Sequence, residues 1–95
     1  MTTRRTTIGI LGGGGILGAH APAFMKLADQ CAVTAIAEAN PARDDRIRSL
    51  LGPDVRIYRD YRDVLALPEV NAVDILLPHD LHMPAVIESA RAGMC

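Results

Sequence analysis

The chain has 95 residues, enough for one small domain, and apolar residues make up 49% of it, enough for a core. With one phenylalanine and no tryptophan, that core must be aliphatic. The net charge of −1 gives no sign of a nucleic-acid surface, and two cysteines do not make a disulfide framework. No apolar run reaches the roughly 20 residues of a membrane span, so we expect a cytoplasmic protein that binds neither nucleic acid nor membrane.

The first strand is predicted at about residues 7–11, and a glycine-rich turn leads from it into a helix at about residues 15–29. Pro22 lies inside this helix and predicts a kink, because proline has no N–H for the normal helical bond. The apolar face of the helix is expected to consist of Ile16, Phe24 and Leu27.

The second strand is predicted at about residues 32–37 and reads as buried on both faces. Asn40 followed by Pro41 is a typical helix start, with a capping residue and then a proline at the first helical position. This helix is expected to run to Leu51, where Gly52 ends it.

Three further elements continue the alternation of strand and helix. They are a strand at about residues 55–58, a short helix from Asp60 to about Leu67, and a strand at about residues 72–77. A last helix is expected to begin near Asp80 and to end at Gly93. The alternation predicts an α/β fold with a Rossmann-type, doubly wound parallel sheet in the order 3-2-1-4.

The glycine-rich turn is the strongest functional signal. Without side chains, its backbone can approach a pyrophosphate, and the following helix offers free N–H groups and the positive end of its dipole.

Two registers of the glycine motif are possible. The literal G-x-G-x-x-G match uses Gly13, Gly15 and Gly18. We favour the register of Gly12 and Gly14, with Leu17 in the third place, because Gly12 directly follows the apolar strand. A Walker phosphate loop is excluded, since Ala19 and His20 stand where lysine and serine or threonine are required.

Glu38 follows the second strand and lies 20 residues after Gly18. This is close to the spacing of about 20 expected for a carboxylate that accepts hydrogen bonds from the adenosine ribose. Such a carboxylate repels a 2′-phosphate, so we expect NAD as the cofactor, with NADP the alternative. Arg43 could accept a 2′-phosphate, but we expect it to be a solvated residue of the next helix.

The loop after the fourth strand should lie beside the glycine turn, because ligands of open α/β sheets bind where the winding direction reverses. It contains His79 and His82, but no third ligand has a suitable spacing, so we expect no metal. We expect one of these histidines to fix the loop by a hydrogen bond, with proton transfer as the alternative role. His20 is expected to pack under the glycine turn, and Asp74 to point toward a helix end or the sheet margin.

Four segments together resemble the Gfo/Idh/MocA oxidoreductases, the glucose–fructose oxidoreductase and inositol dehydrogenase family. The segments are residues 8–20, 35–41, 71–82 and 90–93. The resemblance implies an N-terminal Rossmann domain that holds NAD or NADP. It implies pyrophosphate contacts from Gly12, Gly14, Gly15 and Ile16, and a ribose contact from Glu38. It also implies that the nicotinamide side is formed by Leu77, Pro78 and His79, with His82 matching the histidine that ends this loop motif.

The sequence departs from the family pattern at several places. Leu17 replaces a small residue, Glu38 a commoner aspartate, and His79 a frequent asparagine. In the family, a fifth strand, a Glu-Lys-Pro motif with a catalytic lysine, and a substrate domain follow the segment that ends here at Gly93. We therefore expect residues 1–95 to be the N-terminal portion of a dinucleotide-binding domain, truncated before strand five, without a substrate domain and without a catalytic residue.

Two functions remain open at this point. The first is the NAD(P)-binding part of an oxidoreductase that transfers hydride between a nicotinamide cofactor and a sugar or polyol. The alternative is a nucleotide-binding Rossmann module without chemistry. In either case the outer edge of the fourth strand is expected to promote self-association, and the 95-residue chain alone to be inactive.

Overall fold

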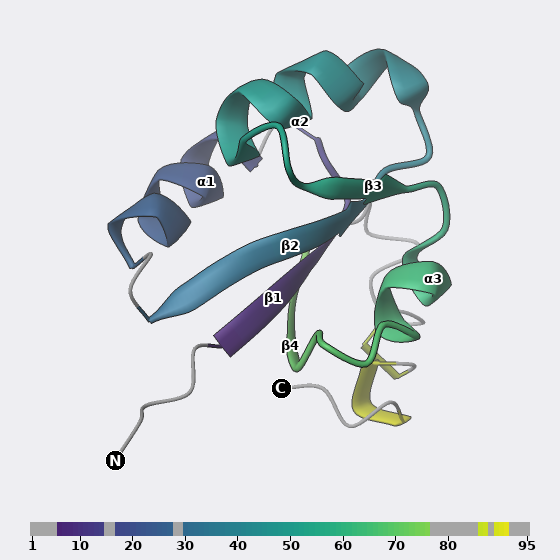
Figure 1. Ribbon diagram of the computed structural model, residues 1–95. Coiled ribbons are helices and arrows are strands. Elements are labelled where there is room, and N and C mark those ends of the chain that lie inside the picture. The colour runs from purple at the N-terminus through teal and green to yellow at the C-terminus, as the bar shows by residue number, and fades with distance from the viewer. Residues whose placement is uncertain (1–5, 15–16, 28–29, 77–85, 88, 92–95) are drawn as a thin grey trace.

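The computed structural model describes residues 6–14, 17–27, 30–76, 86–87 and 89–91. Its centre is a sheet of four parallel strands in the order β3-β2-β1-β4, which confirms the predicted fold class and strand order (Figure 1). The strands are β1 (Thr6–Leu11), β2 (Cys31–Ala37), β3 (Arg56–Tyr58) and β4 (Ala72–Ile75). The helices are α1 (Leu17–Lys26), the 3-10 turn η1 (Pro41–Arg43), α2 (Asp44–Leu51) and α3 (Tyr61–Leu65).

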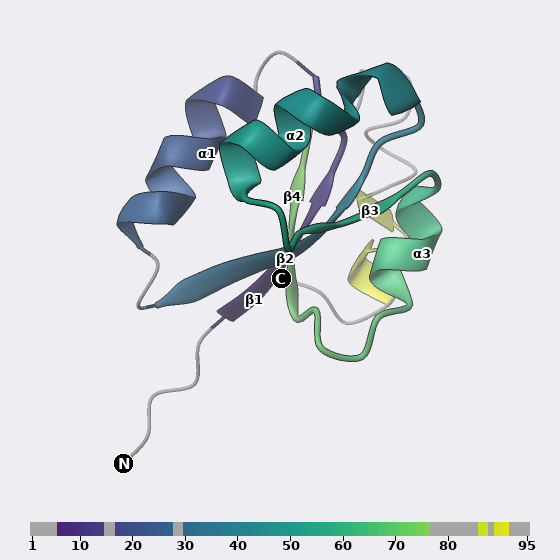
Figure 2. The same ribbon diagram turned by 45° about the horizontal axis from the view of Figure 1, so that its top comes forward.

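Helices cover both faces of the sheet. The helices α1 and α2 lie together on one face, and α3 lies on the other (Figures 1 and 2). The helical residues 86–87 and 89–91 lie on the α3 side (Figures 1 and 2). Two helical layers around a parallel sheet follow from right-handed crossovers between the strands.

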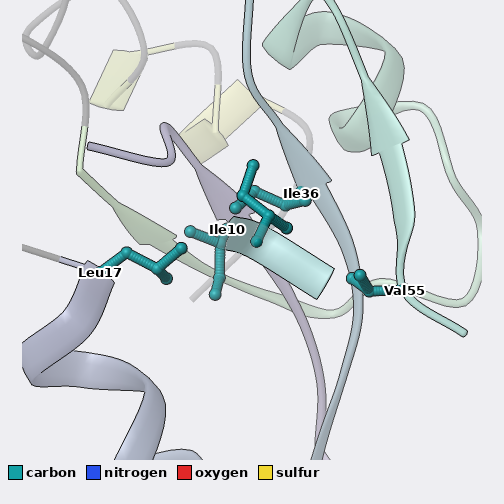
Figure 3. Close-up of a cluster of buried hydrophobic side chains, with 5 residues drawn as sticks. Ile10, Leu17, Ile36 and Val55 are labelled. Atoms are coloured by element: carbon teal, nitrogen blue, oxygen red, sulfur yellow. The ribbon is translucent and has the colours of Figure 1, made fainter. Parts of the chain in front are cut away.

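The alternation of side chains along β1 builds a core on each face. Ile10 joins the cluster under α1 and α2, together with Leu17, Ile36, Ile47 and Val55 (Figure 3). The next residue, Leu11, points to the other face and packs with Val64 of α3. Because both faces are buried, β1 needs apolar residues at successive positions, as its sequence has.

The second strand is less uniformly buried than its sequence suggests. Its last three residues pair with β3 and are buried, whereas residues 32–34 are half-buried because β3 does not extend alongside them. A bulge lies in this half, since Ile8 and Gly9 pair with Val33 and Ala35 and leave Thr34 without a partner in the β1–β2 register. The expectation of a strand buried on both faces therefore holds only for its second half.

The first helix is shorter than predicted, and its apolar face differs. It buries Leu17 and Ala21, while Leu27 lies beyond its end with 46% of its surface exposed. The Leu27 carbonyl accepts hydrogen bonds from the N–H groups of Gln30 and Cys31, which turns the chain toward β2. The placement of Leu27 on the apolar face was therefore wrong. Phe24 packs half-buried against the core, and Ile16 lies outside the described residues.

The predicted starts of α2 and α3 and the end of α2 are confirmed with small changes, whereas the helix predicted from near Asp80 to Gly93 lies mostly outside the described residues. The Asn40 side chain accepts a hydrogen bond from the N–H of Ala42, and the first turn after it is 3-10 before α2 begins. Gly52 ends α2 with a φ of 97°, a conformation that favours glycine. Asp60 caps α3 through the N–H of Arg62, but this helix ends at Leu65. Pro22 lies inside α1, and the kink it predicts stays a prediction.

Candidate functional site

The glycine turn begins where β1 ends. Gly12 directly follows Leu11 and has a φ of 104°, in the left-handed region that glycine adopts readily. Its N–H donates to the carbonyl of Ala37, the last residue of β2, over 2.7 Å. The turn thus starts at Gly12, as the favoured register predicts, and it is fixed to the carboxyl end of the neighbouring strand.

Glu38 lies directly after β2 and points its carboxylate at the turn. It is buried, with 6% of its surface exposed. Its Oε1 accepts a hydrogen bond from the N–H of Gly13 at 2.8 Å, and its Oε2 accepts one from the N–H of Asn40 at 2.8 Å. The Arg43 guanidinium donates to Oε1 at 3.1 Å. The acid therefore connects the glycine turn to the start of η1.

These donors determine the protonation of Glu38. Burial by itself raises the pKa of this carboxyl, but the N–H groups of Asn40 and Gly13 and the Arg43 guanidinium favour the charged form. The pKa of Glu38 consequently lies below its ordinary value. The site presents an ionised carboxylate at neutral pH.

The two glycines after Gly12 differ in the space around them. A Cβ at Gly13 would lie 2.9 Å from Cδ1 of Ile47 and 3.2 Å from Oε1 of Glu38, so packing against α2 requires glycine there. A Cβ at Gly14 would meet a single atom of the described residues within 4 Å, Nη1 of Arg43 at 3.8 Å. The described residues therefore leave room above Gly14, as a loop that receives a ligand would.

Three arginines surround this end of the sheet. Arg43, expected to be solvated, instead contacts Glu38 while 48% of its side chain stays exposed. Arg59 forms two bonds with the Asp44 carboxylate, at 2.9 and 2.7 Å, and donates to the carbonyl of Glu38. Arg46 reaches from α2 to the carbonyl of Gly14 at 3.1 Å. Neither Arg46 nor Arg59 is predicted from the sequence, because their spacing from the turn matches no motif.

His20 and Asp74 form a pair that was not predicted. Nδ1 of His20 lies 2.6 Å from Oδ2 of Asp74, which joins α1 to the edge strand β4. His20 thus contacts a carboxylate and does not simply pack under the turn, while Asp74 lies at the sheet margin as expected. Both residues line a groove of about 420 Å³ with an otherwise apolar lining that includes Ile8 and Phe24. The pair was not recognised because 54 residues separate its members in sequence.

The remaining predicted site residues lie outside the described residues, and their roles stay predictions. They are Gly15, Ile16, Leu77, Pro78, His79 and His82. Within the described part of the chain, no group of three or more His, Cys, Asp or Glu side chains could hold a metal ion. None of the helices described there is long and apolar enough to cross a membrane.

Comparison with known proteins gives a consistent result. The model of the family GFO_IDH_MocA, described as an oxidoreductase family with an NAD-binding Rossmann fold, matches residues 6–95. A search of curated protein sequences finds no match.

Three solved structures illustrate the likeness. The apo scyllo-inositol dehydrogenase from Lactobacillus casei is 26% identical, with a TM-score of 0.85 over 99% of this chain and 28% of that one. A levoglucosan dehydrogenase in complex with NADH is 28% identical, with a TM-score of 0.83 over 96% and 26%. KijD10, a 3-ketoreductase from Actinomadura kijaniata in complex with NADP, is 26% identical, with a TM-score of 0.79 over 96% and 28%. The chain thus spans little more than a quarter of the length of these structures.

Proposed function

Because the chain belongs to this oxidoreductase family with an NAD-binding Rossmann fold, we propose that it forms the cofactor site of an enzyme acting on a sugar or polyol. The observation that carries the proposal is the contact between the glycine turn and Glu38, whose Oε1 lies 2.8 Å from the N–H of Gly13. This contact lies at the carboxyl ends of β1 and β2, where open α/β sheets bind ligands.

The space above Gly14 suits the pyrophosphate of a dinucleotide, since glycine leaves the backbone open to a close approach. Gly12 shapes the turn, and we assign Gly15 and Ile16 to the same group of contacts. On the nicotinamide side we propose Leu77, Pro78 and His79, with His82 ending that loop. When bound, the nicotinamide would supply the hydride acceptor for oxidation of a substrate hydroxyl.

Glu38 would hold the adenosine ribose. A carboxylate has about four acceptor positions, and donors of the described residues fill three of them, two on Oε1 and one on Oε2. Oε2 can therefore accept one ribose hydroxyl without losing a bond. A second hydroxyl would have to replace a donor, and the half-exposed Arg43 guanidinium is the most accessible of the three.

The charge of Glu38 also suggests the choice of cofactor. An ionised, buried carboxylate beside the ribose repels a 2′-phosphate, so we propose NAD as the preferred cofactor. The solved relatives do not decide this question, since their structures include complexes with NADH and with NADP. The relatives named as scyllo-inositol and levoglucosan dehydrogenases support a sugar or polyol substrate.

The experiment is a titration of the intact protein with NAD and with NADP, for the wild type and for Glu38→Ser. We expect the wild type to favour NAD, and the variant to bind NAD more weakly by about tenfold or more through loss of a charged hydrogen bond. The affinity for NADP should fall less or rise, so the difference between the affinities for NAD and NADP becomes smaller.

A panel of sugars and polyols is then tested for NADH formation at 340 nm. Equal affinities of the wild type for both dinucleotides would refute the cofactor preference, and tight binding without turnover of any panel member would favour a module without chemistry.

A further inference from the structure

Arg46 links α2 to the glycine turn. Its Nη1 donates to the carbonyl oxygen of Gly14 at 3.1 Å, and the same oxygen accepts a hydrogen bond from the N–H of Leu17, the first residue of α1. Nothing in the turn motif calls for an arginine at this position of α2. The contact nevertheless brings a guanidinium to the part of the turn where the backbone is open.

Gly18 provides the space that this guanidinium occupies. A Cβ at Gly18 would lie 3.0 Å from Nη2 of Arg46, closer than side chains normally approach each other. In the literal G-x-G-x-x-G match, Gly18 is the third glycine, whose usual purpose is close packing of helix against strand. Here it makes room for an arginine of the next helix. Gly18 and Arg46 therefore act as a pair.

We infer that Arg46 is an anion-recognising residue of the cofactor site and acts on the pyrophosphate, held in position by the Gly14 carbonyl and by the space at Gly18. This inference rests on the proposed function. The Gly14 carbonyl oxygen has partial negative charge and would repel a diphosphate, and the Arg46 guanidinium covers it. The same group adds a full positive charge to the partial charges of the turn and of the α1 N-terminus. Arginine suits this purpose because its planar group of donors matches phosphate oxygens.

The test is a double-mutant cycle on the intact protein, with Arg46→Gln, Gly18→Ala and the double variant. Affinities for NAD and for ADP-ribose are measured by calorimetry, and the affinity for adenosine by NMR titration. We expect Arg46→Gln to lower the affinities for NAD and ADP-ribose about tenfold, which is the size of one charge-assisted contact. The affinity for adenosine should stay nearly unchanged. Gly18→Ala should lower the affinity for NAD in the same direction but by a smaller factor, because a Cβ 3.0 Å from Nη2 shifts the guanidinium without removing it. The double variant should be no weaker than Arg46→Gln.

Two further variants serve as controls. Arg56→Gln removes the same charge from the first residue of β3, at the end of that strand away from the turn, and should leave NAD affinity within about twofold. Arg46→Lys keeps the charge but not the planar donors and should recover part of the loss.

Unchanged NAD affinity in Arg46→Gln would overturn the inference. So would an equal loss of adenosine affinity, which would show that Arg46 only maintains the fold of the site. Additive losses in the cycle would also contradict it, since the two residues would then act separately. A wild type that binds neither NAD nor ADP-ribose would instead refute the proposed function itself.

Discussion

Glu38 fixes the glycine turn, in addition to its proposed role of holding the adenosine ribose. Its carboxylate joins the N–H of Gly13, at the end of β1, to the N–H of Asn40, which caps η1. The glycine turn, the end of β2 and the start of η1 are thus held together by one buried side chain. A substitution at Glu38 changes the turn as well as the proposed ribose contact, so its effect on cofactor affinity has to be compared with its effect on stability.

The pH dependence of stability tests this structural role. The folded pKa of Glu38 lies below its ordinary value of 4.5, so the ionised carboxylate stabilises the fold above the unfolded pKa. That stabilisation is lost as the pH falls through the folded pKa. We predict that Glu38→Gln is less stable than the wild type by about 1–2 kcal/mol at pH 7, and that urea unfolding shows this difference shrinking below about pH 4.5. The bonds to Arg59 lower the pKa of Asp44, although partial desolvation opposes this. Asp44 is present in both proteins, so its contribution to the pH dependence cancels in the difference. A difference that does not change with pH would contradict the role.

The sequence predicts the place of Glu38 but not its contacts. The position of Glu38 can be predicted from the alternation of strands and helices and from its separation from the glycines in sequence, because both can be read from the order of residues. The bonds to Gly13 and Arg43 depend on side-chain rotamers and on how η1 approaches the turn, and no spacing rule contains these. The pair of His20 and Asp74 was missed for the same reason: the predicted strand order places β4 beside β1, but it does not say which side chains of α1 and β4 meet.

At the scale of elements, Gly9 determines how closely α3 approaches the sheet. A Cβ at Gly9 would lie 2.5 Å from Cγ1 of Val64 and 3.2 Å from Cγ1 of Val70. Val64 is fully buried, so it has no open space to move into. We predict that Gly9→Ala destabilises the protein by about 1–3 kcal/mol, measured by urea unfolding, because the packed helix has to shift.

Val64→Ala supplies the matched second variant. It creates a space of its own beside Gly9, so the double variant should lose less stability than the two single variants together. Strict additivity would show that the helix adjusts elsewhere and that Gly9 does not set the packing distance.

The positions of the helices and strands can be predicted from the sequence more accurately than the residues at which they end. The caps at Asn40, Gly52 and Asp60 have local causes, hydrogen bonds or a left-handed φ, and they are where the sequence placed them. The end of α1 depends on the turn around Leu27, whose carbonyl takes two N–H groups from residues beyond the helix. Apolar periodicity alone extended the helix too far, because Leu27 fits the pattern without being buried.

At the scale of the whole molecule, β4 forms one edge of the sheet that the described residues build. Within the described ranges, β4 pairs with β1 along one edge and has no strand on its other edge. We predict that residues 1–95 on their own self-associate, because an unpaired edge offers N–H and C=O groups to a second copy. Light scattering over a range of concentrations checks this. A monomer at every concentration would show that the edge is protected.

The variant Gly14→Val tests most directly whether the backbone at Gly14 lies against the pyrophosphate of a dinucleotide, as we propose. Among the described residues, a Cβ at Gly14 would meet one atom within 4 Å, Nη1 of Arg43 at 3.8 Å, which is an ordinary contact. The variant should therefore keep the urea unfolding midpoint of the wild type, which gives the control for its fold. In the intact protein, calorimetric titration with NAD should show binding to the wild type and none to Gly14→Val, because the side chain occupies the space of the phosphates. NAD affinity equal to that of the wild type would show that the backbone at Gly14 does not lie against the pyrophosphate.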